Sequence, residues 1–256
     1  MYLTVQGLVL RVSEYKDRDA ILTILTRKHG KLTVKARGLR RKNSPLTAPC
    51  QLLAFSEFTL FEYRNMYTIN EASSIQLFQG LRRDIQKLAL GSYFAQAAEV
   101  ISQEDLPNPE LLSLVLNCLY GLTELNLPEP FVKAVFEMRA ACIAGYMPDL
   151  SGCHVCGNAW PDRLDIFMGR LECSGCRSAD SDGIRMPLSP GTLEAMRYLI
   201  GCDEKRLFSF KIGEETAVQL SQVTESYLLT QLERGFSTLD FYKSLFLDSL
   251  PVKVKN

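Results

Sequence analysis

Hydrophobic and polar residues alternate with a period of two in the first part of the chain. Between Lys31 and Arg37, Leu32, Val34 and Ala36 fall on one face, and charged or hydroxyl side chains fall on the other. This is the pattern of a half-buried β-strand. Similar β-rich runs cover residues 5–12, 20–26, 51–63 and 66–75. Five short strands before residue 80 predict a small closed barrel, for which the OB-fold is the best-known five-stranded example.

From about Phe78 the apolar residues follow a helical spacing, with Leu81, Ile85 and Leu88 on one face. Prolines then separate this first helix from a second helix over 110–125 and a third over 131–145. Ser189-Pro190 is typical of a helix start. It predicts a fourth helix to about Ile200. Further helices are expected over 213–233 and 239–250.

Two CxxC pairs, Cys153 with Cys156 and Cys173 with Cys176, are separated by sixteen residues. Each pair brings two thiolates within reach of one ion, and two pairs fill a tetrahedral shell as in structural zinc sites. His154 lies inside the first pair, but four thiolates leave it no necessary role as a ligand. Disulfides and a redox-active CxxC motif are the alternatives.

These patterns together predict an α+β chain with three parts. An OB-fold nucleic-acid-binding barrel is expected over residues 1–78, and an α-helical bundle over 79–150 and 188–250. A four-cysteine zinc-binding insertion over 151–187 interrupts the bundle. The expected cofactor is one structural zinc ion per chain.

The net charge is zero, but it is unevenly distributed. Residues 1–80 carry twelve Lys or Arg against six Asp or Glu, and the remainder carries seventeen against twenty-three. No acidic residue occurs between Asp19 and Glu57, and eight basic residues fall within 27–42. Such asymmetry predicts a basic module joined to an acidic body.

A basic strand with a basic loop after it could follow a phosphate backbone. The alternative is a solvated edge strand, because lysines commonly protect sheet edges. Aromatic residues of the barrel could stack on bases, although we expect Phe55, Phe58 and Phe61 in the core. The expected DNA-binding residues are Lys31, Lys35, Arg37, Arg40, Arg41 and Lys42.

The sequence offers little for catalysis. Its two histidines, His29 and His154, lie in a turn and in the cysteine segment. No Walker lysine loop, GxSxG elbow, HExxH helix or GxGxxG turn occurs in it. We therefore expect no enzymatic activity and no small-molecule substrate.

The compartment follows from what the chain lacks. No apolar run approaches the roughly 20 residues of a membrane span, and the N-terminus does not read as a signal peptide. We expect a cytoplasmic protein without a membrane partner, in which reduced cysteines hold zinc.

The order of barrel, helices and CxxC insertion resembles the RecO family of bacterial recombination-repair proteins. The resemblance covers nearly the whole chain, and Gly145 to Cys156 is its most specific part. The other local matches are Gly7 to Leu10, Tyr15 to Asp19, Leu22 to Thr26, Gly30 to Leu32, Ala36 to Arg40 and Phe136 to Arg139.

The resemblance implies a non-enzymatic recombination mediator of double-strand-break and gap repair, associated with the bacterial nucleoid. Such a protein binds single- and double-stranded DNA and anneals complementary strands. With RecR, it helps RecA displace single-strand-binding protein, whose acidic and apolar tail docks on RecO. A surface for that tail needs a cation beside an apolar pocket.

For the tail we expect Lys133, Phe136 and Arg139, which recur at a spacing of three on the third helix. The alternative places Phe136 in the core and pairs Lys133 with Glu137. Two other functions stay open. A zinc-stabilised RNA-binding or ribosome-associated OB protein would not anneal DNA, and an interaction scaffold would show no salt-dependent nucleic-acid affinity.

Overall fold

The structure is a computed structural model that describes residues 1–64, 66–176 and 183–247. The chain divides into two compact units. The first comprises Met1–Leu125 with Phe236–Asn256, and the second comprises Asn126–Gly235. The helices expected as one bundle are therefore shared between both units. The expected domains, residues 1–78, 79–150 with 188–250, and 151–187, stay a prediction.

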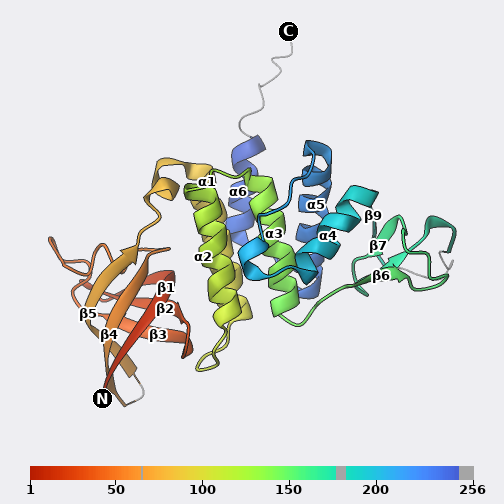
Figure 1. The fold of residues 1–256 in the computed structure, drawn as a ribbon. Coiled ribbons are helices and arrows are strands. Elements are labelled where there is room, and N and C mark those ends of the chain that lie inside the picture. Colours follow the sequence, from red (N-terminus) through yellow and green to blue (C-terminus); the bar gives the residue numbers. More distant parts are fainter. Residues whose placement is uncertain (65, 177–182, 248–256) are drawn as a thin grey trace, which may run out of the picture. The chain divides into compact units, whose positions relative to one another are not determined.

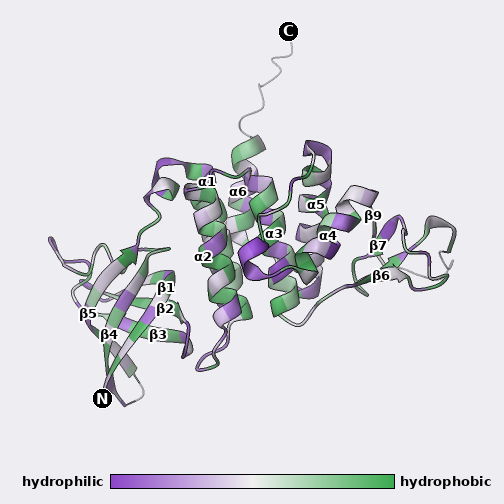
Figure 2. Cartoon of the chain, viewed as in Figure 1, coloured by the Kyte–Doolittle hydropathy of each residue, from purple (hydrophilic) through white to green (hydrophobic). Residues whose placement is uncertain are grey.

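The first unit begins with a closed five-stranded barrel of strand order β1-β2-β3-β5-β4 (Figure 1). Figure 2 shows hydrophobic and hydrophilic positions mixed along its strands, and the apolar side chains of Val9, Ile24, Val34 and Phe58 meet in its core. The expected OB-like barrel is confirmed. Its strands are β1 (Tyr2–Tyr15), β2 (Asp19–Thr26), β3 (Gly30–Ala36), β4 (Phe55–Tyr63) and β5 (Met66–Gln76).

The fourth strand begins at Phe55, four residues later than the expected Gln51. Leu53 adopts a left-handed backbone with a φ of 63°, and its N–H donates to the Val9 carbonyl at 2.9 Å. Residues 51–53 therefore form a turn, which the apolar composition of Leu52 and Leu53 concealed.

Three α-helices and a short 3-10 turn (Gln79–Arg83) complete the first unit. The turn takes up the start of the expected first helix, because the Asp84 carboxylate accepts from the Gln86 and Lys87 N–H groups and caps α1 there. The helices of this unit are α1 (Ile85–Ile101), α2 (Pro109–Thr123) and α6 (Ser237–Leu247). The expected end of the last helix at residue 250 lies outside the described residues.

The second unit combines three helices, α3 (Glu129–Ile143), α4 (Pro190–Gly201) and α5 (Glu214–Gln231), with a small sheet. Ser189 caps α4 by accepting from the Thr192 N–H at 3.2 Å, as the Ser-Pro pair predicts. The cysteine insertion forms a four-stranded sheet of order β6-β8-β7-β9. Its strands are β6 (Asp149–Cys153), β7 (Arg163–Asp165), β8 (Arg170–Glu172) and β9 (Arg185–Pro187).

The helices of both units are short or polar when measured against a lipid bilayer. In the described part of the chain, none is both long enough and apolar enough to cross a membrane.

Candidate nucleic-acid interface and metal centre

One end of the barrel is organised around Asp19, the first residue of β2. Its carboxylate accepts from the Gly38 N–H at 2.8 Å and pairs with Lys35 Nζ at 3.2 Å. The Gly38 hydrogen bond and then Lys35 lower the pKa of Asp19, so this carboxylate is ionised at neutral pH. Gly38, with a φ of +65°, turns the chain out of β3. Asp19 thus holds the loop after β3 against β2.

This loop carries the exposed cations that the sequence predicts. Arg37, Arg41 and Lys42 are exposed, and the described residues offer them no acidic partner within salt-bridge distance. Arg40 is also exposed but pairs with Glu14 at 3.0 Å. Three side chains are therefore available for phosphates without breaking an ion pair.

The turn between β1 and β2 adds cations that the sequence analysis missed. The Arg40 N–H donates to the Arg18 carbonyl at 3.1 Å, which places the turn beside the loop. Lys16 and Arg18 are exposed there. Tyr15 lies near two ammonium groups, since its ring centroid is 5.5 Å from Lys16 Nζ and 4.8 Å from Lys35 Nζ. We call Lys16, Arg18, Lys35, Arg37, Arg40, Arg41 and Lys42 the basic end.

Lys31 does not join the basic end. Its Nζ donates to the Glu99 carbonyl at 2.9 Å, and its backbone N–H donates to the Gln103 carbonyl at 3.2 Å. Thr33, on the same face of β3, contacts Glu104. The end of α1 and the segment after it therefore cover this part of the strand. The expectation that Lys31 faces a phosphate is corrected, because Lys31 attaches α1 to the barrel.

The lysines of β3 do not protect a sheet edge. β3 pairs with β2 over its whole length and with β5 at Val34 and Lys35, so it has a neighbour on both sides. The edge-strand alternative does not explain why Lys35 and the loop cations gather here.

The aromatic residues of β4 divide between the two faces of the strand. Phe58 is fully buried, as expected, but Phe61 is 40% exposed. The expectation for Phe61 is wrong, because a spacing of three along a strand places two residues on opposite faces. Phe61 packs outside the barrel against Tyr2, with ring centroids 5.3 Å apart.

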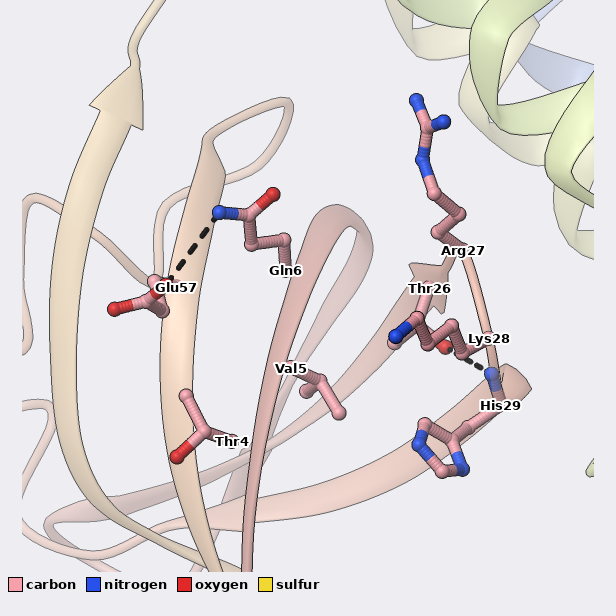
Figure 3. A pocket seen from close by; sticks show the side chains of 8 residues that line it. All are labelled: Thr4, Val5, Gln6, Thr26, Arg27, Lys28, His29 and Glu57. Atoms are coloured by element: carbon pink, nitrogen blue, oxygen red, sulfur yellow. Dashed lines mark hydrogen bonds between the residues drawn. The ribbon is translucent and has the colours of Figure 1, made fainter.

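A polar pocket lies near the turn between β2 and β3, at the other end of β3 from Arg37 (Figure 3). The His29 N–H donates to Thr26 Oγ1 at 3.1 Å and orders this turn. Gln6 and Glu57 form the opposite wall, where they contact each other. Because Glu57 adds a carboxylate to a pocket that the exposed Lys28 also lines, the pocket mixes both charges and is a poorer phosphate site than the basic end.

The four expected metal ligands converge. The Sγ atoms of Cys153, Cys156, Cys173 and Cys176 all lie within 4.8 Å of one another. All four are free thiols, and Cys156 Sγ is 3.9 Å from Cys173 Sγ, well beyond the roughly 2.05 Å of a disulfide. A set of four sulfur donors suits tetrahedral zinc. The structure therefore places a four-thiol cluster that could hold a metal ion where the CxxC spacing predicts it.

Backbone groups around the cluster favour a thiolate at Cys153. Burial acts to raise the pKa of this thiol, but the N–H groups of Cys156, Val155 and Cys173 outweigh burial and lower that pKa to about 6. Interaction with Cys156 is the main cause that raises the pKa of Cys176 to about 12. The Cys153 thiolate forms readily, whereas the Cys176 thiol needs a nearby cation in order to lose its proton.

His154 is not part of the cluster. Its Nδ1 lies 3.0 Å from the Leu171 carbonyl, and its Nε2 lies 3.7 Å from Glu172.

Gly157, directly after the first CxxC pair, has a φ of +73° with open space around it. A left-handed residue there lets the backbone fold back over the thiolates.

The cysteine insertion also contains a buried ion network that sequence reasoning missed. The Arg185 guanidinium on β9 pairs with Glu172 on β8 at 2.7 Å and with Asp165 on β7 at 3.5 Å. Leu164 and Leu171 are fully buried beside it. The sheet therefore has a small core and three strands joined by one guanidinium, in addition to the four clustered thiols.

The expected partner-tail residues lie mostly inside the second unit. Lys133 is 3% exposed and Phe136 is fully buried. Arg139 is half-buried and donates to the carbonyl of Leu199 at 3.1 Å, at the end of α4. The expectation that these three side chains form an exposed surface is therefore corrected. The alternative, in which Lys133 pairs with Glu137, is confirmed at 3.0 Å.

Comparison with known proteins adds the family. The family model described as Recombination protein O N terminal matches residues 1–78, and Recombination protein O C terminal matches residues 82–240. DNA repair protein RecO of Acetivibrio thermocellus is 32% identical over 246 residues, which cover 95% of this chain and 97% of that protein. DNA repair protein RecO of Bacillus subtilis is 30% identical over 246 residues, covering 96% and 93%. With its OB-like barrel, its helices and its cysteine cluster, the chain belongs to the RecO family.

Proposed function

We propose that this chain is a DNA-binding recombination mediator of bacterial double-strand-break and gap repair, acting without enzymatic chemistry. The observation that carries the proposal is the basic end of an OB-like barrel, with Arg37, Arg41 and Lys42 exposed and free of acidic partners among the described residues. Membership of a family whose relatives are named DNA repair proteins favours DNA over RNA as the ligand.

The mechanism follows from charge and shape. When the cations of the basic end neutralise phosphates, they release counterions condensed on the nucleic acid, and this release supplies most of the affinity. Complementary strands neutralised on the same basic surface repel each other less, which favours annealing. The zinc ion, held by the four cysteines, would supply structural stability to the second unit and no chemistry.

The resemblance also implies protein partners, and these belong to the proposal. With RecR, the protein would help load RecA onto DNA coated by single-strand-binding protein, in the nucleoid of the bacterial cytoplasm. The acidic and apolar tail of single-strand-binding protein would need a surface other than Lys133 and Phe136. In the second unit, an open groove lined by Met147, Trp160 and Ile200 offers apolar area, and Lys205 and Arg206 are exposed in the segment that follows α4.

The decisive experiment removes the unpaired cations. The triple substitution Arg37→Ala, Arg41→Ala and Lys42→Ala should weaken single-stranded DNA binding and slow annealing. The slope of log affinity against log salt should flatten by about 2, at roughly 0.7 for each lost phosphate contact. Fluorescence anisotropy at several salt concentrations measures this slope.

A matched control removes three exposed cations from the second unit: Lys205→Ala, Arg206→Ala and Lys211→Ala. This control should keep the parent slope. Equal slopes for the parent and the barrel variant would refute DNA binding at the basic end. Tighter binding of RNA than of DNA of the same sequence, with no annealing, would favour the RNA-binding alternative.

A further inference from the structure

Three exposed aromatic residues form a row on the outer face of the barrel. Tyr2, Phe61 and Tyr63 are 62%, 40% and 60% exposed. Tyr2 and Phe61 are register partners on β1 and β4, and their rings are tilted at 53° to each other. Tyr63 follows Phe61 by two positions, so it faces the same side of β4. We call these three residues the aromatic row.

Strand pairing connects the aromatic row with the basic end. Phe61 lies opposite Thr68 on β5, and Thr68 is the register partner of Lys35 on β3. Thr68 and Lys35 are half-buried, whereas their neighbours Ile69 and Val34 belong to the core. Strands lie about 4.8 Å apart, so Tyr2 and Lys35 are separated by three strand spacings, roughly 15 Å.

Cations accompany the rings at both ends of this path. The Arg64 guanidinium lies 5.2 Å from the Tyr63 ring centroid, and Lys35 lies 4.8 Å from that of Tyr15. At the Lys35 end of the path, the Asp19 carboxylate is paired with Lys35 Nζ at 3.2 Å. Rings with cations at both ends of the path match the chemistry of a single strand, in which bases stack on aromatic faces while phosphates meet the cations.

We propose that the aromatic row stacks on the bases of single-stranded DNA whose phosphates occupy the basic end. This rests on the proposed function and deepens it, because it gives the barrel a preference for unpaired strands. A duplex stacks its bases on each other and leaves no base face free for Tyr2, Phe61 or Tyr63. The flanking cations favour single-stranded DNA over an apolar protein surface, because an apolar surface carries no charge that would pair with them.

The test replaces the rings and keeps apolar bulk, with Tyr2→Leu, Phe61→Leu and Tyr63→Leu combined. Affinity for a labelled oligothymidine should fall about tenfold or more, given the energy of base stacking on aromatic side chains. The salt slope should stay as in the parent, because no phosphate contact is lost. Affinity for duplex DNA, and for an abasic oligonucleotide that carries phosphates without bases, should stay unchanged.

Two exposed aromatics elsewhere in the first unit provide the control. Tyr120 on α2 and Phe241 on α6 are each 50% exposed, and Tyr120→Leu with Phe241→Leu should bind every probe as the parent does. Parent-like oligothymidine binding by the ring variant would overturn the proposal, and a protein partner for the row would then be the better explanation. An equal loss on duplex and abasic probes would overturn it as well.

These failures are distinct from a failure of the proposed function, in which the parent itself binds no nucleic acid.

A direct readout covers the case in which the ring variant does not fold. Trp160 is the single tryptophan of the chain, so Trp160→Phe with Tyr2→Trp leaves one indole, in the aromatic row. Oligothymidine should quench its fluorescence and the abasic oligonucleotide should not. Unquenched emission at saturating oligothymidine contradicts stacking.

Discussion

A single lysine shows how burial decides the role of a side chain. Lys133 Nζ pairs with Glu137 at 3.0 Å and with Glu225 at 2.8 Å, and it donates to the Ser221 carbonyl at 3.2 Å. Thr224 donates to Glu137 at 2.9 Å. Two carboxylates therefore share one buried ammonium, and these contacts join α3 to α5. The cluster stabilises the second unit and leaves Lys133 unable to bind a partner.

This cluster predicts a pH dependence of stability. Burial raises the pKa of Glu137 to about 7 against the opposing effect of Lys133. Between its ordinary value near 4.5 and 7, the folded state keeps a proton that the unfolded state has released. The free energy of unfolding should therefore fall as pH rises through this window and level off above it. Glu137→Gln, which cannot ionise, should remove this contribution.

Urea unfolding at pH 5 and pH 7.5, followed by the fluorescence of Trp160 in the same unit, measures the difference. Glu215→Gln, at an exposed position at the start of α5, serves as the control and should keep the pH dependence of the parent. If the free energy of unfolding changed equally between pH 5 and pH 7.5 in the parent and in Glu137→Gln, Glu137 would ionise normally.

At the scale of elements, the cysteine insertion combines two sources of stability. The four thiols converge as the sequence predicts, but the sheet also buries Leu164, Leu171 and the pairing of Arg185 with Glu172. Replacing Arg185 would leave a buried carboxylate without its partner, which costs about 3–5 kcal/mol of stability. We therefore expect metal loss to weaken this element, and part of its sheet to persist.

Removing ligands tests the metal centre. Cys153→Ser with Cys176→Ser should reduce the zinc content from about one ion per chain to none. It should also lower the free energy of unfolding of the second unit by more than about 3 kcal/mol. Elemental analysis and urea unfolding followed at Trp160 give the two values. His154→Ala, outside the cluster, should keep the metal.

Acidification should release the metal as well, because protons compete for the thiolates and affinity falls as pH decreases. Full stability of the double cysteine variant, or a parent that carries no metal when purified in zinc, would exclude a structural zinc site.

At the scale of the whole molecule, the last described helix completes the first unit. Phe236, directly before α6, is 1% exposed and packs edge-on against Tyr93 of α1 at 5.5 Å. Two residues later, Thr238 donates from Oγ1 to Gln96 at 2.6 Å. The chain thus returns, after the whole second unit, to close the apolar face of α1.

This return predicts that two similar substitutions differ in effect. Phe236→Ala should lower the free energy of unfolding by about 3 kcal/mol or more, because it leaves a cavity beside Tyr93. Phe241→Ala, at a position that is 50% exposed, should change it by less than about 0.5 kcal/mol. Urea unfolding followed by circular dichroism compares them. Similar costs at both positions would mean that α6 does not pack on α1.

The sequence by itself determined the features that depend on neighbouring residues. The alternation of Leu32, Val34 and Ala36 predicted β3, the Ser189-Pro190 pair predicted the start of α4, and the CxxC spacing predicted the cluster. Periodicity, capping and short ligand turns are local, so they can be recognised without the fold. The accumulation of basic residues after Asp19 was equally visible.

Only the tertiary structure decided which of these side chains are accessible. Lys31 and Arg37 look equivalent in sequence, but α1 covers Lys31 and leaves Arg37 exposed. Lys133 has a helical spacing suitable for a surface, but α5 brings Glu225 against it. Each outcome depends on a residue more than sixty positions away along the chain. Local patterns determine on which face of its element a residue lies. Long-range packing determines whether another element covers that face.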